Sequence, residues 1–99
     1  MKTYRSCSDG KVTVNGAPLP LRLDLANKSP TGFSWGYSGS GPAQLSIAIL
    51  ADHAGDKQAL RYYQPFKERF IASLDANSPW TLTTEDVESM LEEVRTDKC

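Results

Sequence analysis

The feature that most constrains this chain is a nearly unbroken apolar segment at its centre. Residues 45–51 hold six apolar side chains and only one polar one. Pro42 fits the first position of a helix, with Ser40 or Gly41 as its cap, and Gly55 fits the residue after its end. A helix with so little polar surface is expected to be buried on more than one side. The rest of the chain must therefore pack around it.

The length of the chain allows one such core. With 99 residues, the protein is expected to form a single domain, residues 1–99, around a modest core. Its 39% apolar and 23% charged residues are typical of a folded globular protein. No apolar run reaches the roughly 20 residues of a membrane span, and the N-terminus has no signal-peptide core. We therefore expect a cytoplasmic protein with no membrane partner.

The N-terminal half is predicted to form a small antiparallel sheet of three to four strands. Apolar and polar side chains alternate there with a period of two, which is typical of strands with one buried face. Turn residues at 8–10 and 15–16 separate the first strands. Pro18 and Pro20 cannot donate ladder hydrogen bonds, so they place their stretch in a loop or at a sheet edge. The expected strands are residues 3–7, 11–14, 21–25 and 33–37.

The C-terminal half is predicted to be helical. A second helix follows Gly55, with Asp56 as its cap, and Pro65 should kink or split it because proline removes a backbone hydrogen bond. A last helix starts after a break at residues 77–79, with Thr83 and Asp86 placed as a capping box. The sequence thus predicts an α+β fold, with the sheet packed against about three helices. The apolar stripes expected to face inward are Leu60, Tyr63, Phe66, Phe70, Ile71 and Leu74, then Val87, Met90, Leu91 and Val94.

The two cysteines, Cys7 and Cys99, lie near opposite ends of the sequence. No cysteine or histidine spacing matches a closed zinc site, so neither a metal nor a cofactor is expected. A chain without a secretory signal is expected to keep both thiols free. The alternative is a disulfide between the two ends or between two chains.

The last predicted helix carries the first candidate site, an acidic outer face. Such a face imitates a phosphate backbone and suits the basic nucleic-acid channel of another protein. The plainer alternative is a solvated helix surface, with acids favoured in the first turn by the helix dipole. The whole chain has a formal charge of only −1, so direct binding to nucleic acid is not expected. The candidate partner-binding residues are Glu85, Glu88, Glu92 and Glu93.

The second candidate site is the glycine-rich loop that leads into the central helix. Free backbone N–H groups at a helix start attract anions, and neighbouring aromatic rings offer a platform for a base. The loop lacks the lysine and the spacing of established phosphate loops, so the alternative is a tight turn in which glycine allows close packing. The candidate ligand-binding residues are Trp35, Tyr37, Ser38, Gly39, Ser40 and Gly41.

Asp52 and His53 are the third set of chemically interesting residues. Neighbouring side chains on a helix point about 100° apart, so the two are not expected to share a face. His53 is the only histidine, and no serine or cysteine is spaced to complete a triad with it. We expect His53 to contact carbonyl groups at the end of its helix. The sequence therefore predicts that the protein is not an enzyme.

One long motif resembles a known family. The run from Ser29 to Leu45, SPTGFSWGYSGSGPAQL, is similar to the signature of a small family of unknown function that occurs in bacterial, archaeal and phage genomes. Residues 48–53, Gly55-Asp56, Tyr63-Gln64 and Phe66-Lys67 extend the resemblance, which covers residues 4–87. Pro65 departs from the pattern and puts the continuity of the second helix in question.

The resemblance implies a biological setting rather than a catalytic residue. Small proteins carried by phages and mobile elements are often interaction proteins, and some inhibit host defence complexes such as CRISPR effectors. The leading expectation is a non-enzymatic protein-binding protein, in its specific form a phage-encoded inhibitor of a host defence complex. The alternative is a protein that binds a phosphorylated or nucleotide ligand through its glycine-rich loop. Either form is compatible with a homo-oligomer, because a small core gains from burying a face against a copy.

Overall fold

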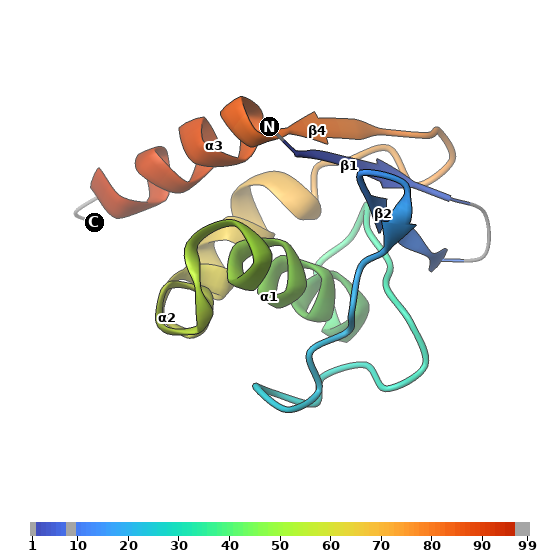
Figure 1. The fold of residues 1–99 in the computed structure, drawn as a ribbon, viewed down its shortest axis with the longest axis horizontal. Helices are drawn as coiled ribbons and strands as arrows, with labels where there is room; N and C mark the ends of the chain where they lie inside the picture. The colour runs from blue at the N-terminus through green and yellow to red at the C-terminus, as the bar shows by residue number, and fades with distance from the viewer. Residues whose placement is uncertain (1, 8–9, 97–99) are drawn as a thin grey trace.

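The computed structural model describes residues 2–7 and 10–96 of the chain. It confirms the expected α+β class: a four-stranded antiparallel sheet and three α-helices (Figure 1). Residues 8–9 of the expected first turn, and Cys99, lie outside the described residues. The elements, in chain order, are β1 (Thr3–Ser6), β2 (Val12–Val14), β3 (Ala17–Pro18), α1 (Ser40–Ala54), α2 (Asp56–Phe66), the π-helix η2 (Lys67–Ile71), β4 (Thr81–Thr83) and α3 (Thr84–Thr96).

The sheet has the strand order β3-β2-β1-β4. Tyr4 in β1 pairs with Val14 on one side and with Leu82 on the other. Pro18 lies in the two-residue edge strand β3, so its predicted edge position is confirmed. The sequence predicts a helix start at residues 82–87 with Thr83 as its N-cap, and α3 does begin at Thr84, but the strand formed by residues 81–83 just before it was not predicted. The chain turns into α3 only after it has paired with β1.

The apolar segment of the sequence forms the buried α1, at the centre of the molecule (Figure 1). All residues from 41 to 51 are buried, and Leu45, Ile49 and Leu50 have no exposed surface. Gly39 takes the N-cap position, so the helix starts two residues before the predicted Pro42. The core that surrounds α1 includes Tyr4 from the sheet.

The second helix changes its winding after Pro65, which confirms the predicted disruption. α2 ends at Phe66 and continues as η2, in which the N–H of Ala72 donates to the carbonyl of Lys67, five residues earlier (2.9 Å). A π-turn is one way to absorb the hydrogen bond that proline removes. The prediction that Leu60 faces inward is wrong: its side chain is 45% exposed, because Ala59 is the buried residue at this turn.

The last helix begins as the sequence predicts. Asp86 accepts a hydrogen bond from the N–H of Thr83 (2.9 Å), and its own N–H donates to the Thr83 hydroxyl (3.2 Å). This reciprocal capping box fixes the angle at which β4 passes into α3. Val87, Leu91 and Val94 are buried and Met90 is partly buried, so the outer face of α3 is left to its acidic residues.

Residues 19–39 contain neither helix nor strand, which corrects two predicted strands. At residues 21–25 the chain makes a turn, in which Arg22 has a φ of +59° and Leu25 donates to the Arg22 carbonyl (3.0 Å). The Arg22 guanidinium binds Asp24 (3.0 Å) and Asp56 (3.1 Å), and Asp56 makes no capping hydrogen bond to α2. The alternation of residues 33–37 ends at Gly36, whose φ of +85° takes the backbone out of the strand region.

The reason for the irregular path is the buried side chain of Gln44. Its amide nitrogen donates to the carbonyls of Leu21 (2.6 Å) and Ala26 (3.0 Å). Its amide oxygen accepts from the N–H groups of Lys28 (2.7 Å) and Ser29 (3.0 Å). One side chain from α1 thus supplies the partners that a neighbouring strand would supply in a sheet.

Candidate functional site

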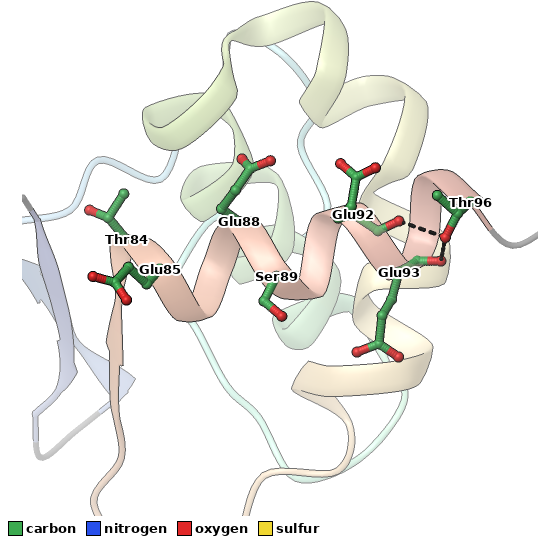
Figure 2. Close-up of a pocket in the computed structure, with 7 residues that line it drawn as sticks. All are labelled: Thr84, Glu85, Glu88, Ser89, Glu92, Glu93 and Thr96. Carbon is green, nitrogen blue, oxygen red and sulfur yellow. Dashed lines mark hydrogen bonds between the residues drawn. The ribbon is translucent and has the colours of Figure 1, made fainter.

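The acidic residues of α3 lie in two neighbouring rows on its outer face. Residues four apart share a row on a helix, so Glu88 and Glu92 form one row and Glu85, Ser89 and Glu93 the other. Figure 2 shows the two sets pointing to opposite flanks of the helix. Glu85 and Glu93 are two helical turns apart, about 12 Å along the axis. A shallow depression here is lined by Thr84, Glu85, Glu88, Ser89, Glu92, Glu93 and Thr96.

The two rows differ in how their charge is balanced. Glu88 contacts His53 (2.6 Å) and Arg95 (3.2 Å), and Arg95 also contacts Glu92 (3.2 Å). In the other row Glu93 has a longer ion pair with Arg69 (3.5 Å). Glu85 makes no ion pair or hydrogen bond to another residue in the part of the chain that the structure describes. The row of Glu85 and Glu93 therefore carries the less compensated charge.

The carboxyl group of Glu88 is held in its charged form by its partners. The hydrogen bond from His53, followed by the nearby Arg95, keeps the pKa of Glu88 below its usual range. The side chain is still 49% exposed, so it faces solvent while it links α1 to α3. Arg95 extends the link to α2 through two hydrogen bonds to Gln58 (3.1 and 3.2 Å).

His53 and Asp52 lie in separate networks, as the sequence predicts for neighbours on a helix. Asp52 accepts hydrogen bonds from the buried Tyr4 hydroxyl (2.7 Å) and from Lys2 (3.1 Å). The predicted partner of His53 is wrong, because its ring contacts the Glu88 carboxylate rather than the carbonyls of its own helix. Burial and the Asp52 carboxylate raise the pKa of Tyr4. No sequence pattern pointed to these partners, since they come from β1 and α3.

The glycine-rich loop is packed tightly against its surroundings. A Cβ at Gly41 would lie 1.7 Å from the Ser34 hydroxyl oxygen, and one at Gly39 would lie 2.5 Å from the Tyr37 ring. Ser38 donates to the carboxylate of Glu68, which places a negative charge where an anionic ligand was predicted. These contacts favour the tight-turn alternative for the loop. Gly41 is also buried, whereas Ser40, the first residue of α1, is exposed.

The two aromatic candidates of the loop have different environments. Tyr37 is 52% exposed, and its hydroxyl shares a hydrogen bond with Ser34 (2.8 Å). Trp35 is partly buried, and its ring meets the Trp80 ring edge to face, with centroids 5.4 Å apart. The structure thus does not gather the six predicted ligand-binding residues around one cavity. Trp35 instead lines a cavity with residues from β1 and from the turn before β4.

The described part of the chain has neither a cluster of metal-binding side chains nor a membrane-spanning helix. Residues 2–7 and 10–96 contain no group of three or more histidine, cysteine or acidic side chains arranged to hold a metal ion. Within the same residues, every helix is too short or too polar to cross a bilayer. The one cysteine described, Cys7, is exposed and free.

Comparison with known proteins identifies the family. The family model DUF6166, described as a family of unknown function, matches residues 2–93. The chain therefore belongs to this family, as the resemblance of its SPTGF motif and the following residues predicts. No curated protein and no solved structure matches the chain.

Proposed function

We propose that this chain is a small, non-enzymatic protein-binding protein that docks through the outer face of α3 on a positively charged surface. The observation that carries the proposal is the row of Glu85, Ser89 and Glu93, which is exposed and only weakly compensated within the chain. Carboxylates that need not be freed from internal partners contribute more to binding, because no ion pair must be broken first.

The contacts that hold α3 in the fold keep this face in place before a partner binds. The capping box fixes the start of α3, and the links from Arg95 and His53 fix its flank. A pre-positioned row of charges steers a basic partner and loses little side-chain freedom on binding. A basic channel that normally holds nucleic acid has the matching charge. In its specific form, the proposal is a phage-encoded inhibitor of a host defence or nucleic-acid-processing complex.

The proposal is tested by affinity capture from a bacterial lysate that contains such complexes. The tag belongs at the N-terminus on a long linker, because Lys2 is hydrogen-bonded to Thr84 at the start of α3. We expect a stoichiometric partner whose retention falls as salt rises, since exposed charge pairs are screened. Capture that is insensitive to salt would point to a different surface.

A matched pair of variants separates the α3 face from net charge. Glu85→Gln with Glu93→Gln raises the net charge by two, and so does Thr31→Lys with Gln64→Lys at exposed positions outside α3. We expect the first pair to weaken capture at least about tenfold, and the second less than about twofold. Equal loss in both pairs would mean that overall charge, rather than the α3 face, drives binding.

A further inference from the structure

The outer face of α2 has no role in the proposed function, yet it complements the outer face of α3. We propose that this α2 face docks on the α3 face of a second copy of the chain, with Leu60 seated over Ser89. The two cations beside Leu60 then reach Glu85 and Glu93. The inference rests on the proposed function in one respect, because it takes the same α3 face as the surface that receives cations.

The α2 face is the side of this helix that points away from the core. α2 lies at the outside of the molecule next to α1 (Figure 1), and it packs inward through the buried Ala59 and Phe66. Residues three and four apart share a face of a helix, so Lys57, Leu60 and Arg61 lie together on the other side. All three are exposed. These three residues define the α2 face.

The cations of the α2 face have no carboxylate partner in the part of the chain that the structure describes. The side chain of Lys57 makes no ion pair or hydrogen bond there. The guanidinium carbon of Arg61 lies 5.4 Å from the centroid of the Tyr62 ring, and this is its one side-chain contact. Asp56, the one acidic residue of α2, is held by Arg22 (3.1 Å). Both cations can therefore pair with a partner before any internal ion pair is broken.

Leu60 gives the α2 face an apolar centre. It is one of three large apolar residues that are exposed among those described, and the other leucine of this set, Leu23, lies in the turn at residues 21–25. A single exposed leucine is common on protein surfaces. What distinguishes Leu60 is its place between two unpaired cations on one helix face. This arrangement suits an interface with an apolar contact at its centre and charges around it.

The α3 face offers a matching hollow. Ser89 has a short side chain between the long side chains of Glu85 and Glu93, so their row is lowest at its middle (Figure 2). The depression along this face has a volume of about 650 Å³, which leaves ample room for a leucine side chain. A leucine above Ser89 packs against the aliphatic parts of the neighbouring glutamates, while their carboxylates stay at the rim.

The charges of the two faces also match in number and in reach. Lys57 and Arg61 are one turn apart, about 6 Å along the helix axis, whereas Glu85 and Glu93 are about 12 Å apart. Lysine and arginine side chains are long and flexible enough to spread over this difference. A carboxylate accepts several hydrogen bonds, so Glu93 keeps its contact with Arg69 (3.5 Å) when a second cation arrives. Two unpaired cations thus meet the less compensated acidic row.

The contact is weak and competes with the partner of the proposed function. Exposed ion pairs and one leucine make a small interface, so we expect association at about 0.1 to 1 mM protein. The two copies use different faces, so each copy keeps one free face of each kind for a further copy. A basic partner that binds more tightly displaces the second copy, because both need the same carboxylates. Self-association therefore covers the α3 face only while no such partner is present.

The direct test is sedimentation equilibrium of the full chain in a reducing buffer, which keeps the exposed Cys7 thiol free. At low salt, we expect the weight-average mass to rise at least about 1.5-fold between about 50 μM and about 2 mM protein. At about 0.5 M salt the mass should return to that of the monomer, because exposed charge pairs are screened. A monomer at about 2 mM in low salt would overturn the proposal, and so would association that salt does not weaken.

Complementation between two variants identifies the two faces. Lys57→Gln with Arg61→Gln removes the cations of α2 and leaves α3 intact. Glu85→Gln with Glu93→Gln removes the carboxylates of α3 and leaves α2 intact. Each variant alone should stay monomeric at about 2 mM, whereas an equimolar mixture should form a dimer and grow no further, because one intact contact remains. A mixture that stays monomeric would show that the two faces do not bind each other.

Matched controls separate the α2 face from net charge and from exposed apolar surface. Arg5→Gln with Lys11→Gln gives the same net charge as the α2 pair at exposed positions outside α2, and should associate like the wild type. Leu60→Ala should weaken association about fivefold, and Leu23→Ala less than about twofold. Equal effects of the α2 variants and their controls would contradict docking through α2.

This proposal and the proposed function fail separately. The variant with Lys57→Gln and Arg61→Gln keeps the α3 face, so it should capture a partner from a lysate as well as the wild type does. A wild type that captures a partner but stays monomeric at about 2 mM would refute self-association alone. A wild type that associates through these faces but captures no partner would refute the proposed function alone.

Discussion

Residues 19–39 and the outer face of α3 both reach the surface, but they use their polar groups differently. In residues 19–39, four backbone polar groups are bound by Gln44, and glycines allow the chain to touch its neighbours closely. On α3, the backbone is satisfied by the helix, and long acidic side chains project outward. The most distinctive sequence motif thus packs within the fold, whereas the less distinctive charged face projects into solvent.

Of the variants proposed here, Gln44→Leu should lower the free energy of unfolding most, because Gln44 orders residues 21–29. The change removes four hydrogen bonds and leaves two carbonyls and two N–H groups of residues 21–29 without their partner. We expect a loss of about 4 kcal/mol in the free energy of unfolding, measured by urea denaturation. Ser46→Ala is the control, because the other buried polar side chain of α1 bonds only within its own helix (2.9 Å) and should cost about 1 kcal/mol or less. Similar losses for both would show that Gln44 does not hold the segment.

Gly36→Ala should have the next largest effect. A Cβ there would lie 2.9 Å from the Cα and N of Ala76, and the φ of +85° disfavours any side chain. We expect about 3 kcal/mol of destabilisation by thermal unfolding. Gly16→Ala has a similar φ of +83° but open space around its Cβ, and should cost about 1 kcal/mol. The difference between the two variants measures the close contact alone, and no difference would mean that the loop yields without cost.

Tyr4→Phe tests the buried link between the sheet and α1. It removes the hydrogen bond to Asp52 (2.7 Å), while Lys2 still contacts that carboxylate, so we expect a loss of about 1 to 2 kcal/mol at pH 7. The fold raises the pKa of Tyr4, because burial and Asp52 both disfavour the phenolate. The contribution of its hydroxyl is thus complete below about pH 10, the ordinary tyrosine value, and is lost as pH rises further. Urea unfolding from pH 7 to 11 should show the wild type converging toward the variant.

Glu88→Gln tests the ion pairs that link α3 to α1. The half-exposed ion pairs of Glu88 are screened by solvent, so the expected loss at pH 7 is no more than about 1 kcal/mol. The fold lowers the pKa of Glu88, which means that its contribution is present above the ordinary glutamate value and fades as pH falls through the lowered one. Wild type and variant should therefore have the same urea midpoint in acid. A constant difference at all pH values would contradict the charged link to His53.

Glu85→Gln with Glu93→Gln should have the smallest effect on the fold. Glu85 has no described partner and the ion pair of Glu93 is long, so the unfolding free energy should change by less than about 0.5 kcal/mol. The thermal midpoint should accordingly stay close to that of the wild type. A large drop would show that this row serves stability, and would remove it from the proposed docking face.

The regular elements could be predicted because their patterns are local. The apolar run from Leu45 to Ala51 is flanked by the helix signals of Pro42 and Gly55, and Thr83 with Asp86 carries its capping signal within four residues. Pro65 predicted a disruption for the same reason. Leu60 was misplaced because the small Ala59, rather than the larger side chain beside it, lies in the buried position.

The irregular elements could not be predicted because their partners are distant in sequence. Leu21, Leu23 and Leu25 alternate like a strand, but Gln44 binds the carbonyls of Leu21 and Ala26 at the two ends of this stretch, which forms a turn. The fourth strand depends on pairing Leu82 with Tyr4, 78 positions earlier. At the candidate site, the exposed glutamates were predictable from helical spacing. Their pairing with His53 and Arg69 depends on how three helices pack, and no local signal reports that.

The way the sheet ends has a consequence for concentrated solutions of the protein. One outer strand is two residues long and contains Pro18, which has no N–H to offer. The other is three residues long, and the N–H of Thr83 is taken by Asp86. Neither end presents a ladder long enough to template a strand from another molecule. Copies of the protein should therefore resist fibril growth, and any assembly that they form must be built from side chains.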